Sequence, residues 1–70
     1  MAWESKYYNY GVVKIDGNNV KVYYDQSNYI TIYVNEQITQ VSWAGGELNV
    51  SLANGNVRRY SDQSNYTTIY

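Results

Sequence analysis

The sequence predicts an all-β domain, an antiparallel meander of seven to eight short strands that forms a small barrel or sandwich. Three observations support this fold class. Apolar residues recur at every second position over most of the chain, which is the period of a half-buried strand. Asn and Gly clusters separate the alternating segments and favour tight hairpins. Finally, a unit of about 37 residues occurs twice, and both copies show the same alternation.

The repeat is clearest in a run of nine residues. The run Asp-Gln-Ser-Asn-Tyr-Ile-Thr-Ile-Tyr begins at position 25 and recurs from position 62, with Thr67 in place of Ile30. Further residue pairs match upstream at the same offset: Val13 with Val50, Ile15 with Leu52, Val20 with Val57, Lys21 with Arg58, and Tyr23 with Tyr60. The chain is therefore expected to be a single domain, 1–70, with an internal repeat over 12–33 and 49–70.

The strands follow in chain order from alternation and turn residues. In each unit, a Gly-containing turn joins the first two strands of the repeat, and the Asp-Gln-Ser-Asn turn precedes its last strand. A further strand before Ala-Gly-Gly and one near the N-terminus would give each unit four strands. No window shows the spacing of an amphipathic helix. The expected strands are 6–10, 12–15, 20–24, 29–34, 38–43, 48–52, 57–60 and 66–70.

A second architecture is compatible with the same strands. Four antiparallel strands in about 40 residues form one β-propeller blade, so two propeller-like blades completed by oligomerisation are the alternative to the closed meander. In layout, the chain is similar to lectins in which short two-blade chains trimerise into a propeller. It matches none of their sugar-binding motifs.

Composition narrows the function classes. The chain has no Cys and no His, so neither a disulfide framework nor a thiolate or imidazole metal site is expected, and no metal or cofactor is predicted. The formal charge of −1 gives no sign of a nucleic-acid or membrane partner. No apolar run approaches the roughly 20 residues that span a bilayer, and the N-terminus has no signal-peptide core. A cytoplasmic location is expected, with export as a mature form as the open alternative.

The two units differ at three apolar positions. Where the first unit has Val22, Tyr24 and Ile30, the second has polar residues, namely Arg59, Ser61 and Thr67. We therefore expect the first unit to bury this face more deeply. The second unit leaves the face wetter, because it either lies at the periphery of the fold or turns the face towards a partner.

The repeated turns are the candidate ligand site. Asp and Asn offer directed donors and acceptors, and an adjacent Tyr offers an apolar ring with a polar tip, a combination that suits carbohydrate. The same residues also make good turns without any ligand. Surface carboxylates lack the water-excluding pocket that acid–base catalysis needs, so no enzyme is predicted. The ligand-binding candidates are Asp25, Asn28, Tyr29, Asp62, Asn65 and Tyr66.

Self-assembly is predicted alongside ligand binding. The strands at 29–34 and 66–70 are β-prone, almost uncharged and free of Pro, so an exposed edge there favours pairing with another copy. Four tyrosines without a counterpart in the second unit are interface candidates: Tyr7, Tyr8, Tyr10 and Tyr24. The preferred function is a self-associating binding module, a homo-oligomer with a carbohydrate or protein partner. A small accessory or structural protein of a larger assembly, such as a virus particle, is an alternative.

A second alternative is a β-barrel that binds single-stranded nucleic acid. Such proteins combine cations with stacking aromatic rings. However, the chain has few cations and no RNP motif, and ordinary cross-strand pairing of an arginine with Glu47 would explain the same residues. The candidates for this surface are Lys21, Tyr23, Arg58, Arg59 and Tyr60.

Overall fold

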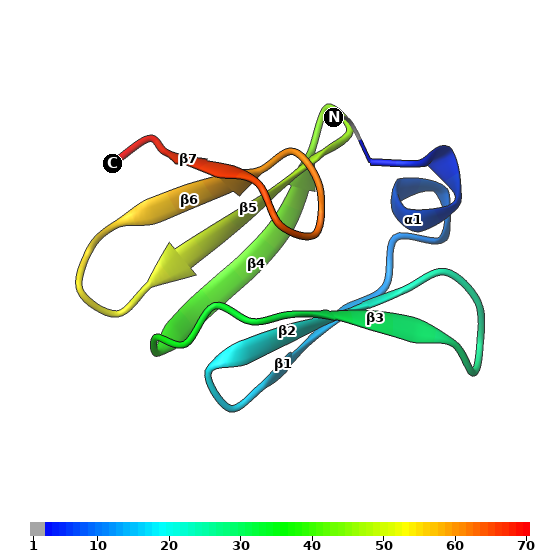
Figure 1. Cartoon of the computed structure of the whole chain (residues 1–70), viewed down its shortest axis with the longest axis horizontal. Helices are drawn as coiled ribbons and strands as arrows, with labels where there is room; N and C mark the ends of the chain where they lie inside the picture. Colours follow the sequence, from blue (N-terminus) through cyan, green and yellow to red (C-terminus); the bar gives the residue numbers. More distant parts are fainter. Residues whose placement is uncertain (1–2) are drawn as a thin grey trace.

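A computed structural model describes residues 3–70 and shows seven β-strands and one short helix. The elements are α1 (Ser5–Tyr10), β1 (Val13–Asp16), β2 (Asn19–Tyr23), β3 (Tyr29–Ile32), β4 (Ile38–Ala44), β5 (Glu47–Leu52), β6 (Val57–Tyr60) and β7 (Tyr66–Thr68). They form two antiparallel sheets, β1-β2-β3 and β4-β5-β6-β7, in which strands adjacent in the sequence lie side by side (Figure 1). The predicted all-β antiparallel fold is confirmed.

The predicted strand at 6–10 is wrong, because this segment forms α1. The helix ends at Gly11, whose left-handed backbone (φ 76°) lets its N–H donate to the carbonyl of Tyr7 at 2.9 Å. Just before the helix, the ring of Trp3 meets the ring of Tyr7 edge to face at 5.3 Å and that of Trp43 at 5.4 Å. A helix of six residues has little stability of its own, so this packing decides its conformation.

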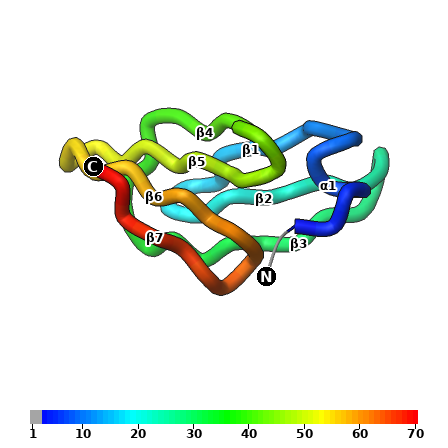
Figure 2. Tube along the Cα trace, turned by 90° about the horizontal axis from the view of Figure 1, so that it is seen from above, coloured from blue at the N-terminus to red at the C-terminus, as the bar shows by residue number. Residues whose placement is uncertain are grey.

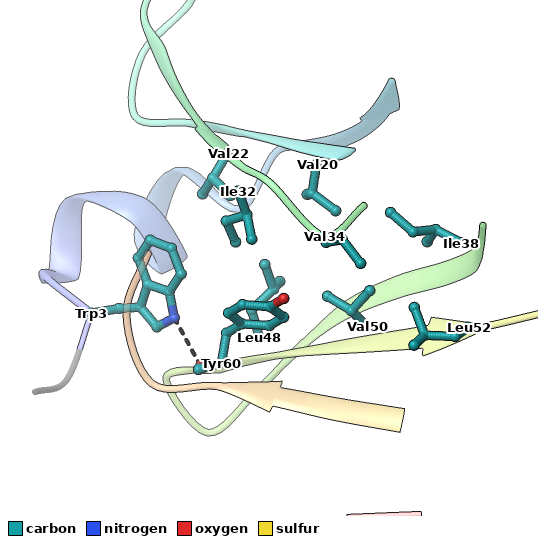
Figure 3. Close-up of a cluster of buried hydrophobic side chains, with 10 residues drawn as sticks. All are labelled: Trp3, Val20, Val22, Ile32, Val34, Ile38, Leu48, Val50, Leu52 and Tyr60. Carbon is teal, nitrogen blue, oxygen red and sulfur yellow. Dashed lines mark hydrogen bonds between the residues drawn. The ribbon is translucent and has the colours of Figure 1, made fainter. Parts of the chain in front are cut away.

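The hydrophobic core lies between the two sheets (Figure 3). Alternate side chains of β2 and β5 are buried, as the period of two predicts. The indole Nε1 of Trp3 adds a buried hydrogen bond, which it donates to the carbonyl of Tyr60 at 2.9 Å. This arrangement is consistent with a small sandwich. The buried residues are Trp3, Val20, Val22, Ile32, Val34, Ile38, Leu48, Val50, Leu52 and Tyr60.

The two sides along which the sheets meet differ. Figure 2 shows β1 and β4 along one side, where the two strands are in contact. On the opposite side lie β3 and β7, and most of their Cα atoms are more than 8 Å apart. This separation is well beyond the roughly 4.8 Å between hydrogen-bonded strands. We call this side of the molecule, between β3 and β7, the mouth.

The last two strands of each sheet pair in the same way. In the first sheet, Tyr23 lies opposite Tyr29, with ring centroids 5.1 Å apart. At the corresponding place in the second sheet, Tyr60 lies opposite Tyr66, with ring centroids 5.0 Å apart. The β2–β3 and β6–β7 hairpins therefore share one register, which is consistent with the predicted repeat.

The loops that lead into these hairpins differ by one residue. β1 and β2 are joined by a two-residue loop at 17–18, where Asp16 pairs with Asn19. β5 and β6 are joined by a three-residue loop at 53–55, which ends on Gly55 with a left-handed φ of 94°. Side chains alternate between the two faces of a strand. The two units keep the same spacing in the sequence, so the residue that the second loop takes up in addition shifts the strand pairing by one. Every following side chain therefore turns to the other face.

The two units consequently direct opposite faces of these hairpins towards the core. In β2, Val22 is fully buried, whereas Tyr23 lies on the outer face of its sheet. In β6, Arg59 takes the position of Val22 and is exposed, and Tyr60 takes the position of Tyr23 and is buried. The change from apolar to polar residues in the second unit thus falls on the outer face of the second sheet. The predicted wetter face is observed there.

Candidate functional site

Both copies of the Asp-Gln-Ser-Asn sequence form the same turn. Oδ1 of Asp25 accepts hydrogen bonds from the backbone N–H groups of Ser27 and Asn28 at 2.8 and 2.7 Å, and the Asn28 amide donates to Oδ2 at 2.7 Å. Asp62 is engaged in the same way by the residues two and three positions later. These are Asx turns. The carboxylates and amides proposed for ligand contacts are therefore already bonded within the turns.

Both turns are expected to lose stability in acid. Hydrogen bonds from the Asn side chain, and then from the Ser backbone N–H, lower the pKa of Asp25 and of Asp62. A carboxyl group with a lowered folded-state pKa stabilises the fold above its unfolded value of about 3.9, and this contribution is lost as the pH falls through the folded pKa. Urea unfolding should therefore show decreasing stability between about pH 5 and about pH 2.

The matched variant carries Asp25→Asn and Asp62→Asn, and its stability should change less over the same pH range. Glu4→Gln removes an exposed carboxyl group outside both turns and serves as the control. An unchanged acid dependence in the double variant would contradict a role for the turns.

The surroundings of the two turns differ. Turn residues 62–65 line a hollow of about 350 Å³, and residues 25–28 are not among those that line it. We call it the Trp3 hollow, because the indole of Trp3 and the ring of Tyr7 contribute its aromatic part. Glu4 and Ile30 complete the lining. The polar groups of the second turn therefore lie beside aromatic rings in this hollow, whereas the first turn does not line it.

A smaller hollow of about 230 Å³ lies in the mouth. The amide Nε2 of Gln63 donates to the carbonyl of Thr31 at 2.9 Å and so bridges the two sheets beside this hollow. Tyr33 and Tyr66 also line it, and 71% and 46% of their surfaces are exposed. A side-chain amide thus reaches a β3 carbonyl in the position where the N–H of a neighbouring strand would donate.

Tyr29 and Tyr66, the aromatic candidates next to the two turns, each lie beside a cation. The Nζ of Lys21 is 4.9 Å from the ring centre of Tyr29, and the guanidinium carbon of Arg58 is 4.5 Å from that of Tyr66. Because the hairpins face opposite ways, the first pair lies on an outer face and the second faces the other sheet. The two predicted ligand sites are therefore not equivalent.

The candidates for a nucleic-acid surface are divided by the fold. Lys21 and Tyr23, the two candidates in β2, lie on the outer face of the first sheet. Arg59 lies on the outer face of the second sheet, where its Nε is 3.9 Å from the carboxylate of Glu47, the cross-strand pairing considered as the alternative. Arg58 and Tyr60 lie between the sheets, with 14% of the Arg58 side chain and 2% of Tyr60 exposed. No single surface contains all five residues.

The four tyrosines without a counterpart lie around α1. The rings of Tyr7 and Tyr24 pack edge to face at 5.5 Å, and Tyr8 packs against Trp43 at 6.2 Å. Tyr8 and Tyr10 remain 40% and 43% exposed. Part of this group therefore holds the helix on the sheets, and only part is free for an interface.

Three residues that the sequence analysis did not assign to a site contribute to these surfaces. Trp3 lines the hollow at the second turn. The carboxylate of Glu36 accepts a hydrogen bond from Arg58, and Nζ of Lys14 lies 5.3 Å from the ring centre of Tyr23. With a gap of three residues, Trp3 and Trp43 precede the two units at comparable places in the sequence, and this weak match is the sequence signal for one of these contacts. The contacts themselves depend on how the strands pack.

The fold thus defines a small antiparallel β domain of two meander sheets with an N-terminal helix. Comparison with protein-family models, curated proteins and solved structures finds no match. Over residues 3–70, no helix has the length and apolar character needed to cross a membrane.

Proposed function

We propose that the protein is a non-catalytic binding and assembly module whose copies pair through the open edges of β3 and β7. The supporting observation is the contrast between protected and unprotected sheet edges. A free edge strand presents unpaired backbone N–H and C=O groups, and proteins ordinarily protect such an edge with charges, proline or a bulge.

The edges of β1 and β4, on the side where the two sheets are in contact, have this protection. β1 contains Lys14 and Asp16, and β4 has a register shift between Ile38 and Gln40. Charges and bulges both disfavour the approach of another strand. These two edges also lie against each other, which leaves little room for a partner.

The edges that border the mouth lack these devices, although the carbonyl of Thr31 on the β3 edge accepts a hydrogen bond from Gln63. β3 reads Tyr-Ile-Thr-Ile and β7 reads Tyr-Thr-Thr, with no charge and no Pro, and neither pairing shows a register shift. Each strand begins with a half-exposed tyrosine, Tyr29 or Tyr66. Aromatic residues are enriched at interfaces, where they supply a large contact area. A second copy offers the matching partner strand, and β3, the longer of the two, is the main pairing edge.

This proposal predicts that lysines on the open edges weaken self-association. Thr31→Lys and Thr68→Lys place one charge on each edge, and together they should weaken the dimer about tenfold or more, equivalent to roughly 1.4 kcal/mol. Sedimentation equilibrium over a wide concentration range measures the effect. Thr39→Lys adds the same charge to β4 and should leave association unchanged. A wild-type protein that remains a strict monomer at millimolar concentration would rule out the proposal.

A second candidate function is carbohydrate binding in the Trp3 hollow. The supporting observation is that the ring of Tyr7 and the small exposed part of Trp3 line one hollow with the polar side chains of Gln63 and Ser64. Sugars are bound by this combination, because C–H faces pack on aromatic rings while hydroxyl groups take up hydrogen bonds. The volume of about 350 Å³ also lies within the range of small-ligand sites.

The repeated turn offers a matched test of this candidate. Ser64→Trp fills the hollow, whereas Ser27→Trp makes the same change at the equivalent turn position outside it. In NMR titrations with neutral mono- and oligosaccharides, the wild type and Ser27→Trp should show shifts of the Trp3 indole signal. Ser64→Trp should bind at least about tenfold more weakly. Equal weakening by both variants, or no shift with any sugar, would contradict the assignment.

A further inference from the structure

The outer face of the first sheet carries two lysines stacked beside two tyrosines, Lys14, Lys21, Tyr23 and Tyr29, which we call the lysine–tyrosine face. Each ammonium group lies near a ring, with Nζ to ring-centre distances of 5.3 Å for Lys14 on Tyr23 and 4.9 Å for Lys21 on Tyr29. The two lysines are also direct cross-strand partners on β1 and β2. Like charges in this position repel each other, so an anion on this face would relieve an unfavourable interaction.

The second unit contains the same kind of cation–tyrosine pair with a partner in place. Arg58, the counterpart of Lys21, stacks on Tyr66 at 4.5 Å. Its guanidinium also donates to the backbone carbonyl of Val34 at 3.2 Å and to the carboxylate of Glu36. A segment that presents a carbonyl and, two residues later, a carboxylate thus satisfies the cation of the buried pair.

The corresponding pair in the first unit is open because the loop into its hairpin is one residue shorter. Arg58 is turned inward with 14% of its side chain exposed, whereas Lys21 is turned outward with 29% exposed and Tyr29 with 43%. Asp16 lies 3.5 Å from Lys21, but this carboxylate is itself 65% exposed. Within residues 3–70, no carboxylate lies within ion-pair distance of Lys14. With two lysines and one carboxylate, Asp16, the face therefore carries a net positive charge.

We propose that the lysine–tyrosine face binds an extended acidic polypeptide segment of a partner protein. The carboxylate would lie between the two ammonium groups, and a backbone carbonyl two residues earlier would accept a hydrogen bond from a lysine, in the order in which Val34 and Glu36 satisfy Arg58. Lysine donates from a compact charge with three N–H groups, so it accepts a carboxylate without a fixed bidentate geometry. The face shares no residue with the Trp3 hollow, and the proposal stands independently of that site.

The test uses a fluorescein-labelled peptide with two Val-Asn-Glu units, titrated with the full chain and followed by anisotropy. The wild type should bind it, and the double variant Lys14→Gln with Lys21→Gln should bind about tenfold more weakly or worse, because charge-assisted hydrogen bonds are lost. A peptide with Gln in place of Glu should show the same loss. Asp16→Asn removes the competing carboxylate and should tighten binding.

The controls separate this face from general charge effects. Lys6→Gln and Arg59→Gln each remove one positive charge from other surfaces and should leave peptide affinity unchanged. All the substituted side chains lie on outer surfaces, so every variant should remain folded. Circular dichroism checks this. Equal binding of the Gln peptide, equal loss in the control variants, or tighter binding of single-stranded oligothymidine would overturn the proposal. So would peptide binding only by dimers, since that result assigns the face to a second copy.

Discussion

Exchange of the loop at 53–55 for that of the first unit (Ala53→Asp, Asn54→Gly and Gly55→Asn) is expected to unfold the protein. The resulting Asp-Gly-Asn-Asn sequence favours a two-residue loop closed by positions 53 and 56 without changing the chain length, so the pairing of β6 with β5 shifts by one residue and the side chains of β6 and β7 exchange faces. Arg59 then points into the core in place of Tyr60. Leaving a buried charge unpaired costs several kcal/mol. This is comparable to the whole stability of roughly 4–10 kcal/mol expected for a domain of this size. Loss of the near-UV circular dichroism signal and of cooperative thermal unfolding measures the effect.

The repeat supplies the compensating substitutions. Arg59→Val and Thr67→Ile introduce the side chains that Val22 and Ile30 provide in the first unit. Combined with the loop exchange, they should restore a cooperative transition, because apolar side chains then face the core. Ala53→Ser keeps the three-residue loop and should leave the midpoint unchanged. If the loop-exchange variant alone unfolds at the wild-type midpoint, loop length does not set the orientation of the hairpin.

Trp3→Ala is the second substitution with a large expected effect, about 3–5 kcal/mol of lost stability. Trp3 is 5% exposed, donates a buried hydrogen bond to the carbonyl of Tyr60 and packs edge to face on Tyr7 and Trp43. Because α1 buries no residue of its own, its attachment depends on this indole. The thermal midpoint should fall by roughly 4–8 °C for each kcal/mol, as measured by calorimetry.

Two further variants test the cause of this loss. Trp3→Phe keeps a ring but removes the N–H donor, so it should lose clearly less stability than Trp3→Ala. Tyr33→Ala removes a ring that is 71% exposed and should change stability by less than about 0.5 kcal/mol. A Trp3→Ala protein that melts within a few degrees of the wild type would show that the indole is not part of the stabilising core.

The strands were predictable because their signals are local. Alternation and turn residues predict 57–60, which is β6 as observed, and they place the other six strands to within about two residues. The helix was not predictable in the same way. Its residues are tyrosine-rich and resemble a strand, and only Gly11 marks its end. Contacts of Trp3 with Trp43 and of Tyr7 with Tyr24 decide its conformation, and the local pattern carries no information about them.

The candidate site was predictable only in part. The Asp-Gln-Ser-Asn sequence indicates an Asx turn on its own, and both turns form. Whether a turn lines a hollow depends on what packs beside it, and the residues at 62–65 meet Trp3 only through the complete fold. The inversion of the β6–β7 hairpin had a visible sign, the displacement of one glycine by a single position between the units. Its effect on every following side chain emerges only with the strand register.

The hydrogen bond from Trp3 to Tyr60 also has a consequence for the order of events in folding. It joins residues 57 positions apart, whereas Trp43 lies in the β4–β5 hairpin, opposite Leu48. Closing a long loop costs conformational entropy before the contact at its ends contributes any stabilising free energy. Such a contact therefore forms late. On the ribosome, the indole of Trp3 remains without its hydrogen-bond acceptor until β6 has been synthesised. The first tryptophan of the chain is thus among the last to reach its place.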